Sequence, residues 1–313
     1  MTTAVAVALY NGAQFLQEQL DSLKNQSVQP DQVILCDDGS SDNTVEIAEK
    51  YIAENCLGDR WKLYRNEKNL GYARNFYHAI SLCQTDLVFL CDQDDVWVPE
   101  KIEKMMRVME EHPHIDLLSC KYGKIDGEGK RLYGVLEREP KETGALIAVD
   151  VATVLRAYHW PGMVMCLRSS FFAAIADAIC TEPMAHDMVL ALCAADHHAF
   201  YEYDYLGAFH RRHGNNTANE EHRISKLLNR ERKLRDMQVY NTLLTQISDS
   251  RIPVCAATLQ QVRSRLELAQ ERESAVRERR LLKLWKVYGS DRQKMLRWAS
   301  FACDMWLICV ARK

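Results

Sequence analysis

Three carboxylates follow directly on an apolar segment in the first third of the chain. Leu87–Cys91 consists of apolar residues, and Asp92, Asp94 and Asp95 come immediately after it. Like charges packed this closely repel one another unless a cation or solvent compensates them. Asp92 and Asp94, two residues apart at the end of a strand, can converge on Mg²⁺ or Mn²⁺. The structural alternative is a solvated acidic turn before the helix that Pro99 opens, with Asp95 near the N-terminus of that helix.

A second pair of carboxylates, Asp37 and Asp38, ends another apolar run and precedes Gly39. The glycine lets the backbone turn, and Asp42 or Asn43 can cap the helix that follows. Acidic strand ends in nucleotide sites accept hydrogen bonds from a base or a ribose. Asp37 and Asp38 are therefore candidates for nucleotide binding, whereas Asp42 is interpreted as a helix cap.

The spacing of apolar residues predicts the elements that position these carboxylates. Strands are expected over 4–9, 32–36, 61–65 and 87–91, and helices over 15–23, 43–55, 72–82 and 99–112. Strands that alternate with helices of this length indicate an α/β fold with a mostly parallel sheet and helices on both faces. Ligands of such sheets bind beyond the carboxyl ends of the strands, which is where Tyr10 and Asn11 and both acidic clusters fall.

The composition is that of an ordinary globular protein. The chain has 313 residues, of which 47% are hydrophobic and 27% charged, so collagen-like, low-complexity and disordered classes are excluded. No uncharged apolar run is long enough to predict a transmembrane span, and the N-terminus does not resemble a signal peptide. The eleven cysteines stand singly in apolar runs. Such cysteines are typical of reduced thiols, and a cytoplasmic location is expected.

Four motifs occur in an order and spacing that resemble family 2 glycosyltransferases. They are Ala8–Gly12, Asp37–Thr44, Asn69–Asn75 and Asp92–Trp97. Later segments agree with the resemblance: Trp160–Met165, His186-Asp187 and Arg211–Asn216. The resemblance covers about residues 4–217 and implies the GT-A fold, a Rossmann-like sheet flanked by helices. Within the family, the chain is most similar to the bacterial rhamnosyltransferase-type branch.

The resemblance implies how the donor would be bound. Tyr10, with Asn11 beside it, would lie against the nucleotide base. Either Asp37 or Asp38 would accept the N3–H of that base. Arg74 would face the nucleotide or its phosphates.

It also implies a metal site and a catalytic base. Asp92 and Asp94 would bind the Mn²⁺ or Mg²⁺ ion that bridges the donor diphosphate. Asp187 would take the proton from the acceptor hydroxyl. Arg211 and His213 would close over the diphosphate, with His213 as a further metal ligand.

The expected reaction is an inverting transfer in a single displacement. An oxocarbenium-like transition state needs one well-placed base on the face opposite the leaving group, and a carboxylate suffices. The donor would be a dTDP- or UDP-linked sugar, and the acceptor a hydroxyl of a glycan or lipid-linked glycan in bacterial cell-surface polysaccharide synthesis.

The sequence departs from the family pattern at two positions. His186 stands where many relatives have an acidic residue, which leaves a helix-capping pair as the alternative. Trp160 replaces a small polar residue, so the acceptor pocket can differ.

The C-terminal region is expected to be a separate, basic and helical part, 221–313, that follows a catalytic domain over 1–220. Residues 222–313 hold 20 Lys and Arg against 9 Asp and Glu. Apolar side chains recur there at steps of three and four: Trp298, Phe301, Ala302, Met305, Trp306 and Cys309. A basic helix bearing Trp is typical of an anchor in the plane of the inner membrane. A helix that packs back on the protein, or a dimer interface, is the alternative.

Other functions fit fewer features. Nucleic-acid binding is not expected, because the arginines of the tail alternate with glutamates. Asp92–Val96 also fits the short Asp-x-Asp-x-Val pattern of haloacid-dehalogenase-type phosphatases, which use an aspartyl nucleophile. A non-catalytic protein that binds a sugar nucleotide is the third possibility. No Gly-x-Gly-x-x-Gly motif follows the first strand, which disfavours an oxidoreductase.

Overall fold

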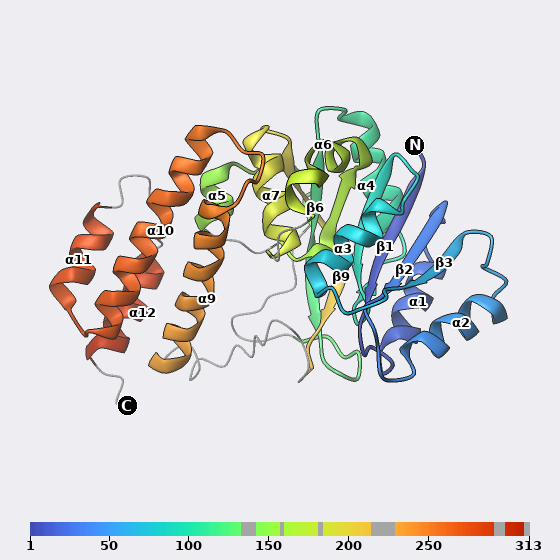
Figure 1. Ribbon diagram of the computed structural model, residues 1–313, viewed down its shortest axis with the longest axis horizontal. Helices are drawn as coiled ribbons and strands as arrows, with labels where there is room; N and C mark the ends of the chain where they lie inside the picture. Colours follow the sequence, from blue (N-terminus) through green and yellow to red (C-terminus); the bar gives the residue numbers. More distant parts are fainter. Residues whose placement is uncertain (133–141, 157–159, 181–183, 214–228, 291–297, 310–313) are drawn as a thin grey trace. The chain divides into compact units, whose positions relative to one another are not determined.

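The computed structural model describes residues 1–132, 142–156, 160–180, 184–213, 229–290 and 298–309 (Figure 1). The chain divides into two compact units. The first takes in Met1–Val149 and His159–Asn216, and the second Asp150–Tyr158 and Thr217–Lys313. The boundary expected at 220/221 lies outside the described residues. The segment 150–158, which the sequence pattern did not single out, groups with the C-terminal helices.

A mixed sheet forms the centre of the first unit. Its strands are β1 (Thr3–Leu9), β2 (Gln32–Asp37), β3 (Trp61–Arg65), β4 (Leu87–Asp92), β5 (Val96–Trp97), β6 (Leu117–Ile125), β7 (Leu146–Ala148), β8 (Met165–Arg168) and β9 (Phe200–Arg211). The strand order is β3-β2-β1-β4-β8-β6-β9-β5, and β7 pairs with β9. The four predicted strands, β1 to β4, are confirmed and run parallel. Strand β8 is antiparallel to β4 and β6.

Helices flank this sheet, as predicted for an α/β fold. They are α1 (Leu16–Lys24), α2 (Thr44–Glu54), α3 (Tyr72–Ser81), α4 (Lys101–Glu111), α6 (Ser169–Ile179) and α7 (His186–Asp196), with a short 3₁₀ turn over Gly162–Val164. Helix α3 packs on β1 and β2, and α4 packs on β6 and β9. Residues 4–7 and 87–91 are completely buried. Strands covered on both faces are apolar throughout, which is why these runs were visible in the sequence.

The second unit is helical. It contains α5 (Val151–Arg156), α9 (Arg230–Asp249), α10 (Ala256–Arg277), α11 (Leu281–Ser290) and α12 (Trp298–Cys309), drawn in orange to red from α9 onward in Figure 1. The Nε of Arg265 in α10 donates to the carbonyl of Leu155 at 3.1 Å, which explains why α5 belongs to this unit. Within the described residues, no helix has the length and apolar character needed to cross a bilayer.

Helix α12 presents one face to the core of the second unit and another to solvent. Leu307 and Ile308 are buried in that core, and the fully buried Asp304 pairs with Arg272 at 2.5 Å. Phe301 is partly buried against Tyr288, with ring centroids 4.9 Å apart. Four members of the predicted apolar face are exposed: Ala302, Met305, Trp306 and Cys309. Part of the tail prediction, residues 291–297 and the side chain of Trp298, lies outside what the structure describes.

Candidate active site

The polar clusters predicted from the sequence meet at one edge of the sheet. Leu9 of β1 is paired with Asp37 of β2, and Ala8 is paired with Asp92 of β4. The loops that follow these strands therefore begin side by side. The amide of Tyr10 donates to Oε1 of Gln93 at 2.8 Å, and Nε2 of Gln93 donates back to the Tyr10 carbonyl at 2.8 Å.

Asn11 holds the first loop against the second. Its backbone has a positive φ of 49°. Its amide donates to Oγ of Ser40 at 2.9 Å, and its side-chain oxygen accepts from the amide of Ser41 at 2.8 Å. The neighbouring Tyr10 is 50% exposed. The Tyr10 ring is accordingly accessible to a ligand, whereas the side-chain oxygen of Asn11 bonds to the chain itself.

Asp37 and Asp38 are both buried and both organise backbone. Asp37 accepts hydrogen bonds from the amides of Gly39 and Ser40, at 3.2 Å or slightly more. Asp38 accepts from the amides of Leu70 and Gly71, at 2.7 and 2.9 Å. The latter contacts fix the turn that opens α3.

Helix α3 carries Arg74 on its exposed side. Asp38 therefore positions the helix that bears Arg74. Contact between either carboxylate and a nucleotide base stays a prediction, as does contact between Arg74 and the donor.

The carboxylates of the acidic cluster after β4 are buried close to one another, which disfavours their charged forms. Burial, the neighbouring Asp94 and then Asp187 raise the pKa of Asp92 to about 7. Burial and both neighbouring carboxylates raise the pKa of Asp95 well above its usual range. Oδ2 of Asp95 is buried with no hydrogen-bond partner among the described residues. The buried ammonium of Lys101 lowers the pKa of both Asp92 and Asp95, so a positive charge stabilises the cluster.

His213 lies beside Asp94, and its role as a metal ligand stays a prediction. Its Nε2 is 2.8 Å from Oδ2 of Asp94, and its ring lies 4.6 Å from that of Phe15. The remainder of the predicted Arg211–Asn216 motif, from Gly214 onward, is outside the described residues.

Arg211 packs against the acidic loop. Its side chain is completely buried. Its Nε donates to the carbonyl of Asp94 at 2.9 Å, its Nη2 donates to Oε2 of Glu18 at 2.5 Å, and its amide donates to Oδ1 of Asp95 at 2.9 Å. The antiparallel pairing of β5 with β9 sets Phe209 opposite Val96, so residue 211 falls next to the loop. Contact between Arg211 and the donor diphosphate stays a prediction.

Asp187 lies within electrostatic reach of the acidic cluster although 95 positions separate it from Asp92. It occupies the first turn of α7 and is half-buried. Its Oδ1 accepts from the amide of Met188 at 2.8 Å, a contact that suits a helix terminus. Burial raises the pKa of Tyr72, and the negative charge of Asp187 raises it further. The fold thus brings the predicted base within electrostatic reach of Asp92, one of the predicted metal ligands.

Glu18 and Lys101 contact the candidate site but were not among the residues predicted from the sequence. Glu18 belongs to the polar side of α1 and carries no local signal. Lys101 does carry one, because it stands on the apolar face of α4 four residues before the buried Met105. Its ammonium lies 3.3 Å from the centroid of the Trp97 ring, and burial lowers its pKa to about 8. A lysine at a core position of an amphipathic helix is a signal that could have been used.

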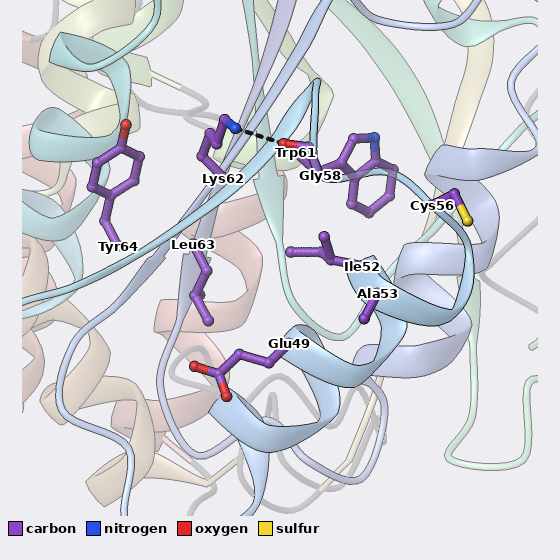
Figure 2. Close-up of a pocket in the computed structure, with 9 residues that line it drawn as sticks. All are labelled: Glu49, Ile52, Ala53, Cys56, Gly58, Trp61, Lys62, Leu63 and Tyr64. Atoms are coloured by element: carbon purple, nitrogen blue, oxygen red, sulfur yellow. Dashed lines mark hydrogen bonds between the residues drawn. The ribbon is translucent and has the colours of Figure 1, made fainter.

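A separate pocket lies at the β3 edge of the sheet. Figure 2 shows this pocket of about 440 Å³, lined by residues of α2, of β3 and of the connection between them. Within it, Nζ of Lys62 donates to the carbonyl of Gly58 at 2.5 Å. None of the lining residues is among those predicted for the site.

The sequence matches curated glycosyltransferases over part of its length. The putative glycosyltransferase EpsE of Bacillus subtilis (strain 168) is 32% identical over 138 residues, which are 44% of this chain and 49% of EpsE. The amylovoran biosynthesis glycosyltransferase AmsE of Erwinia amylovora is 27% identical over 135 residues, 41% of this chain and 47% of AmsE. The chain spans about half the length of these relatives.

Solved structures share the fold. Staphylococcus aureus TarS 1–349 in complex with UDP-GlcNAc has a TM-score of 0.60 at 19% identity, covering 92% of this chain and 78% of that one. The mannosyltransferase PcManGT from Pyrobaculum calidifontis, in complex with GDP-Man and Mn²⁺, has a TM-score of 0.57 at 15% identity, covering 98% and 84%. Both likenesses confirm the expected GT-A-like arrangement of sheet and helices.

The family itself is identified from the sequence. Residues 4–169, more than half of the chain, match the family described as glycosyl transferase family 2. The match includes the motifs at Tyr10, Asp37-Asp38 and Asp92–Asp95. It therefore favours a glycosyltransferase over the phosphatase alternative. The chain belongs to glycosyltransferase family 2.

Proposed function

We propose that the chain is an inverting glycosyltransferase that moves a sugar from a nucleotide-diphosphate donor to a hydroxyl of a glycan or lipid-linked glycan in bacterial cell-surface polysaccharide synthesis. The observation that carries the proposal is that the charge of Asp187 acts on Asp92, which lies at the carboxyl edge of the sheet. One set of carboxylates there can hold a cation and the donor, while the other deprotonates the acceptor.

The donor set at this edge fits Mn²⁺ or Mg²⁺. Asp92, Asp94 and His213 offer carboxylate and imidazole ligands. Burial first, and then the charges of Asp94 and Asp187, raise the pKa of Asp92, and a bound cation would offset both effects. No group of three such side chains is preassembled as a metal cage in the described part of the chain. That agrees with the habit of Mg²⁺, which takes one or two carboxylates and completes its shell with water and substrate phosphates. A bound ion would supply charge stabilisation to the leaving diphosphate.

The chain's own residues perform the remaining steps of the proposed reaction. Tyr10 receives the base of the nucleotide, and Arg74 faces the nucleotide or its phosphates. Asp187 accepts the proton of the acceptor hydroxyl as the acceptor oxygen bonds to the anomeric carbon on the face opposite the leaving group, while the bond from that carbon to the diphosphate oxygen breaks and the nucleoside diphosphate leaves. The configuration at the anomeric carbon of the sugar is thereby inverted. We assign a dTDP- or UDP-linked donor, with rhamnose as the sugar favoured by the branch that the motifs resemble.

Calorimetric titration of UDP, dTDP, GDP and CMP, each with and without Mn²⁺, tests the proposal. One nucleotide is expected to bind in the presence of the ion and much more weakly without it. Asp94→Asn should remove that dependence on Mn²⁺. Asp187→Asn should bind the same nucleotide normally and lose transfer by at least a hundredfold, since general base catalysis is worth roughly 10²–10⁴ in rate. Folded protein that binds none of the four nucleotides contradicts the proposal.

We further propose that the second unit binds the inner membrane surface through α11 and α12. Large apolar side chains of these helices are exposed: Leu281, Leu282, Trp285, Met305 and Trp306. Leu282 is 82% exposed and Trp285 63%. Residues 277–290 hold five Lys and Arg against one Glu. Exposed apolar side chains beside a surplus of positive charge favour an anionic bilayer as the partner.

Sedimentation with lipid vesicles tests the membrane proposal. The protein is expected to sediment with phosphatidylglycerol vesicles and to stay in solution with phosphatidylcholine vesicles. The double variant Leu282→Ser/Trp285→Ser should bind at least tenfold more weakly. Val239→Ser is the matched control, because Val239 is an apolar residue of the same unit that is 71% exposed on α9. Equal binding of the double variant and the wild type would contradict the proposal.

A further inference from the structure

A short turn over residues 160–164 is bonded to β9 at one end and to α4 at the other. Nε1 of Trp160 donates to Oε2 of Glu202 at 2.5 Å. The carbonyl of Met163 accepts from Nζ of Lys101 at 2.5 Å. Lys101 is the buried cation whose charge acts on the acidic cluster. The turn is therefore held at both ends, and one of its anchors lies next to the proposed metal ligands.

Between these anchors, Gly162 lies directly against His186. A Cβ atom at position 162 would be 2.6 Å from Nε2 of His186 and 3.4 Å from its Cε1. Contacts shorter than 3.0 Å are not tolerated, so any side chain at 162 requires the imidazole ring or the turn to move. The turn cannot yield readily, because Lys101 holds the next residue.

The ring of His186 is packed among other aromatic rings, which restrict its movement away from Gly162. It stacks on Phe76 with centroids 4.0 Å apart and an interplanar angle of 21°. The rings of Tyr72 and Tyr77 lie edge-on to it at 6.0 and 6.5 Å. His186 is only 4% exposed. The imidazole is thus clamped between Phe76 on one side and Gly162 on another.

His186 acts in this clamp through its shape. Neither ring nitrogen has a hydrogen-bond partner in the part of the chain that the structure describes. Burial lowers the pKa of His186, so the ring is neutral near pH 7. A neutral, buried ring with no polar contact fills space, and its packing fixes the position of the backbone that carries it.

We propose that Gly162 and His186 form a spacer that sets the position of Asp187 relative to Asp92. His186 immediately precedes Asp187 in the first turn of α7, so displacing its ring moves the Asp187 carboxylate. His186 is in this sense a positioning residue, and Gly162 is the surface against which it is seated. The inference rests on the proposed function where it takes Asp187 as the base, but the spacer itself is a property of the fold.

The test compares Gly162→Ala, His186→Ala and the double variant. Gly162→Ala is expected to lower kcat at least tenfold with nucleotide affinity unchanged, because a displacement of about 1 Å can cost on the order of a hundredfold in rate. The double variant should be no slower than His186→Ala, since the alanine methyl then meets no ring. His186→Gln keeps a polar group without the ring and should behave like His186→Ala. Gly58→Ala is the control, because a Cβ there meets nothing within 4 Å.

A second readout keeps the spacer testable without any activity. Gly162→Ala should lower the urea midpoint of unfolding in the wild type and leave it unchanged in the His186→Ala background. Additive midpoints, or a Gly162→Ala variant with wild-type kcat, overturn the spacer. Recovery of activity in His186→Gln overturns it as well, since a polar contact would then carry the role. A wild-type protein that binds nucleotide but transfers no sugar refutes the proposed function alone, and the midpoints still decide the spacer.

Discussion

Arg211 is expected to stabilise the first unit far more than its ion-pair partner Glu18 does. The Arg211 side chain is completely buried, whereas 53% of the Glu18 side chain is exposed, beside a pocket of about 640 Å³. Removing one member of a buried pair costs about 3–5 kcal/mol, while a solvated partner contributes about 0–1 kcal/mol. Arg211→Met leaves the carbonyls of Asp94 and Asp126 without their donor but leaves Glu18 in water. We therefore expect a loss of about 3 kcal/mol for Arg211→Met. Glu18→Gln should cost about 1 kcal/mol or less, because the carboxylate that it removes is half-exposed and the guanidinium keeps its hydrogen bonds to the carbonyls of Asp94, Asp126 and Gly127.

Hydrogen exchange of peptides from β4 and β9 measures this difference locally, without assuming that the two units unfold together. A loss of about 3 kcal/mol makes exchange through global opening roughly a hundredfold faster. Arg211→Lys should fall between the other two variants, because an ammonium keeps the charge but cannot reproduce the guanidinium's fork of donors. Arg211→Met should also weaken Mn²⁺-dependent nucleotide binding at least tenfold, because Asp94 loses its support.

Two results would refute this reasoning. Equal acceleration of exchange by Glu18→Gln and Arg211→Met would show that the exposed carboxylate, and not burial, governs the pair. Unchanged exchange in Arg211→Met would show that its contacts with the Asp94 carbonyl contribute nothing to stability.

Two further predictions concern stability. Asp304→Asn should destabilise the second unit by about 3 kcal/mol, because it leaves Arg272 buried opposite a neutral amide. Arg277→Ala removes a member of a more exposed pair and should cost less than about 1 kcal/mol. Hydrogen exchange of α10 peptides measures both losses, and equal effects would contradict the burial argument. The free energy of unfolding should fall between pH 8 and pH 10 under reducing conditions, because burial raises the pKa of thiols such as Cys36, to about 12. A thiol whose folded pKa is raised contributes stability below its unfolded value near 9, and loses about 1.4 kcal/mol per pH unit above it. Lys101, with its pKa lowered to about 8, acts in the opposite direction and offsets about 2 kcal/mol of this loss. Urea midpoints at the two pH values measure the net fall, and a constant midpoint would show that the thiols titrate alike in both states.

Much of the fold could be read from local pattern. Strands β1 and β4 are buried on both faces, so their residues are continuously apolar and stand out in the sequence. Polar residues directly after such strands must lie at one edge of a parallel sheet, which is why Asp37 and Asp92 were placed correctly at the edge where β1 ends, one on each side of that strand. The extent of an apolar run and the residue that ends it are local properties.

The roles of side chains within the site depended on contacts between distant segments. The pairing of β5 with β9 decides that Arg211 lies under the acidic loop while His213 reaches Asp94. The same is true of Lys101, whose burial beneath the cluster follows from the packing of α4. Charge and residue type are written in the sequence, whereas burial and the identity of a neighbour arise only when segments about a hundred residues apart pack together. Those two properties decide which groups an arginine such as Arg211 contacts.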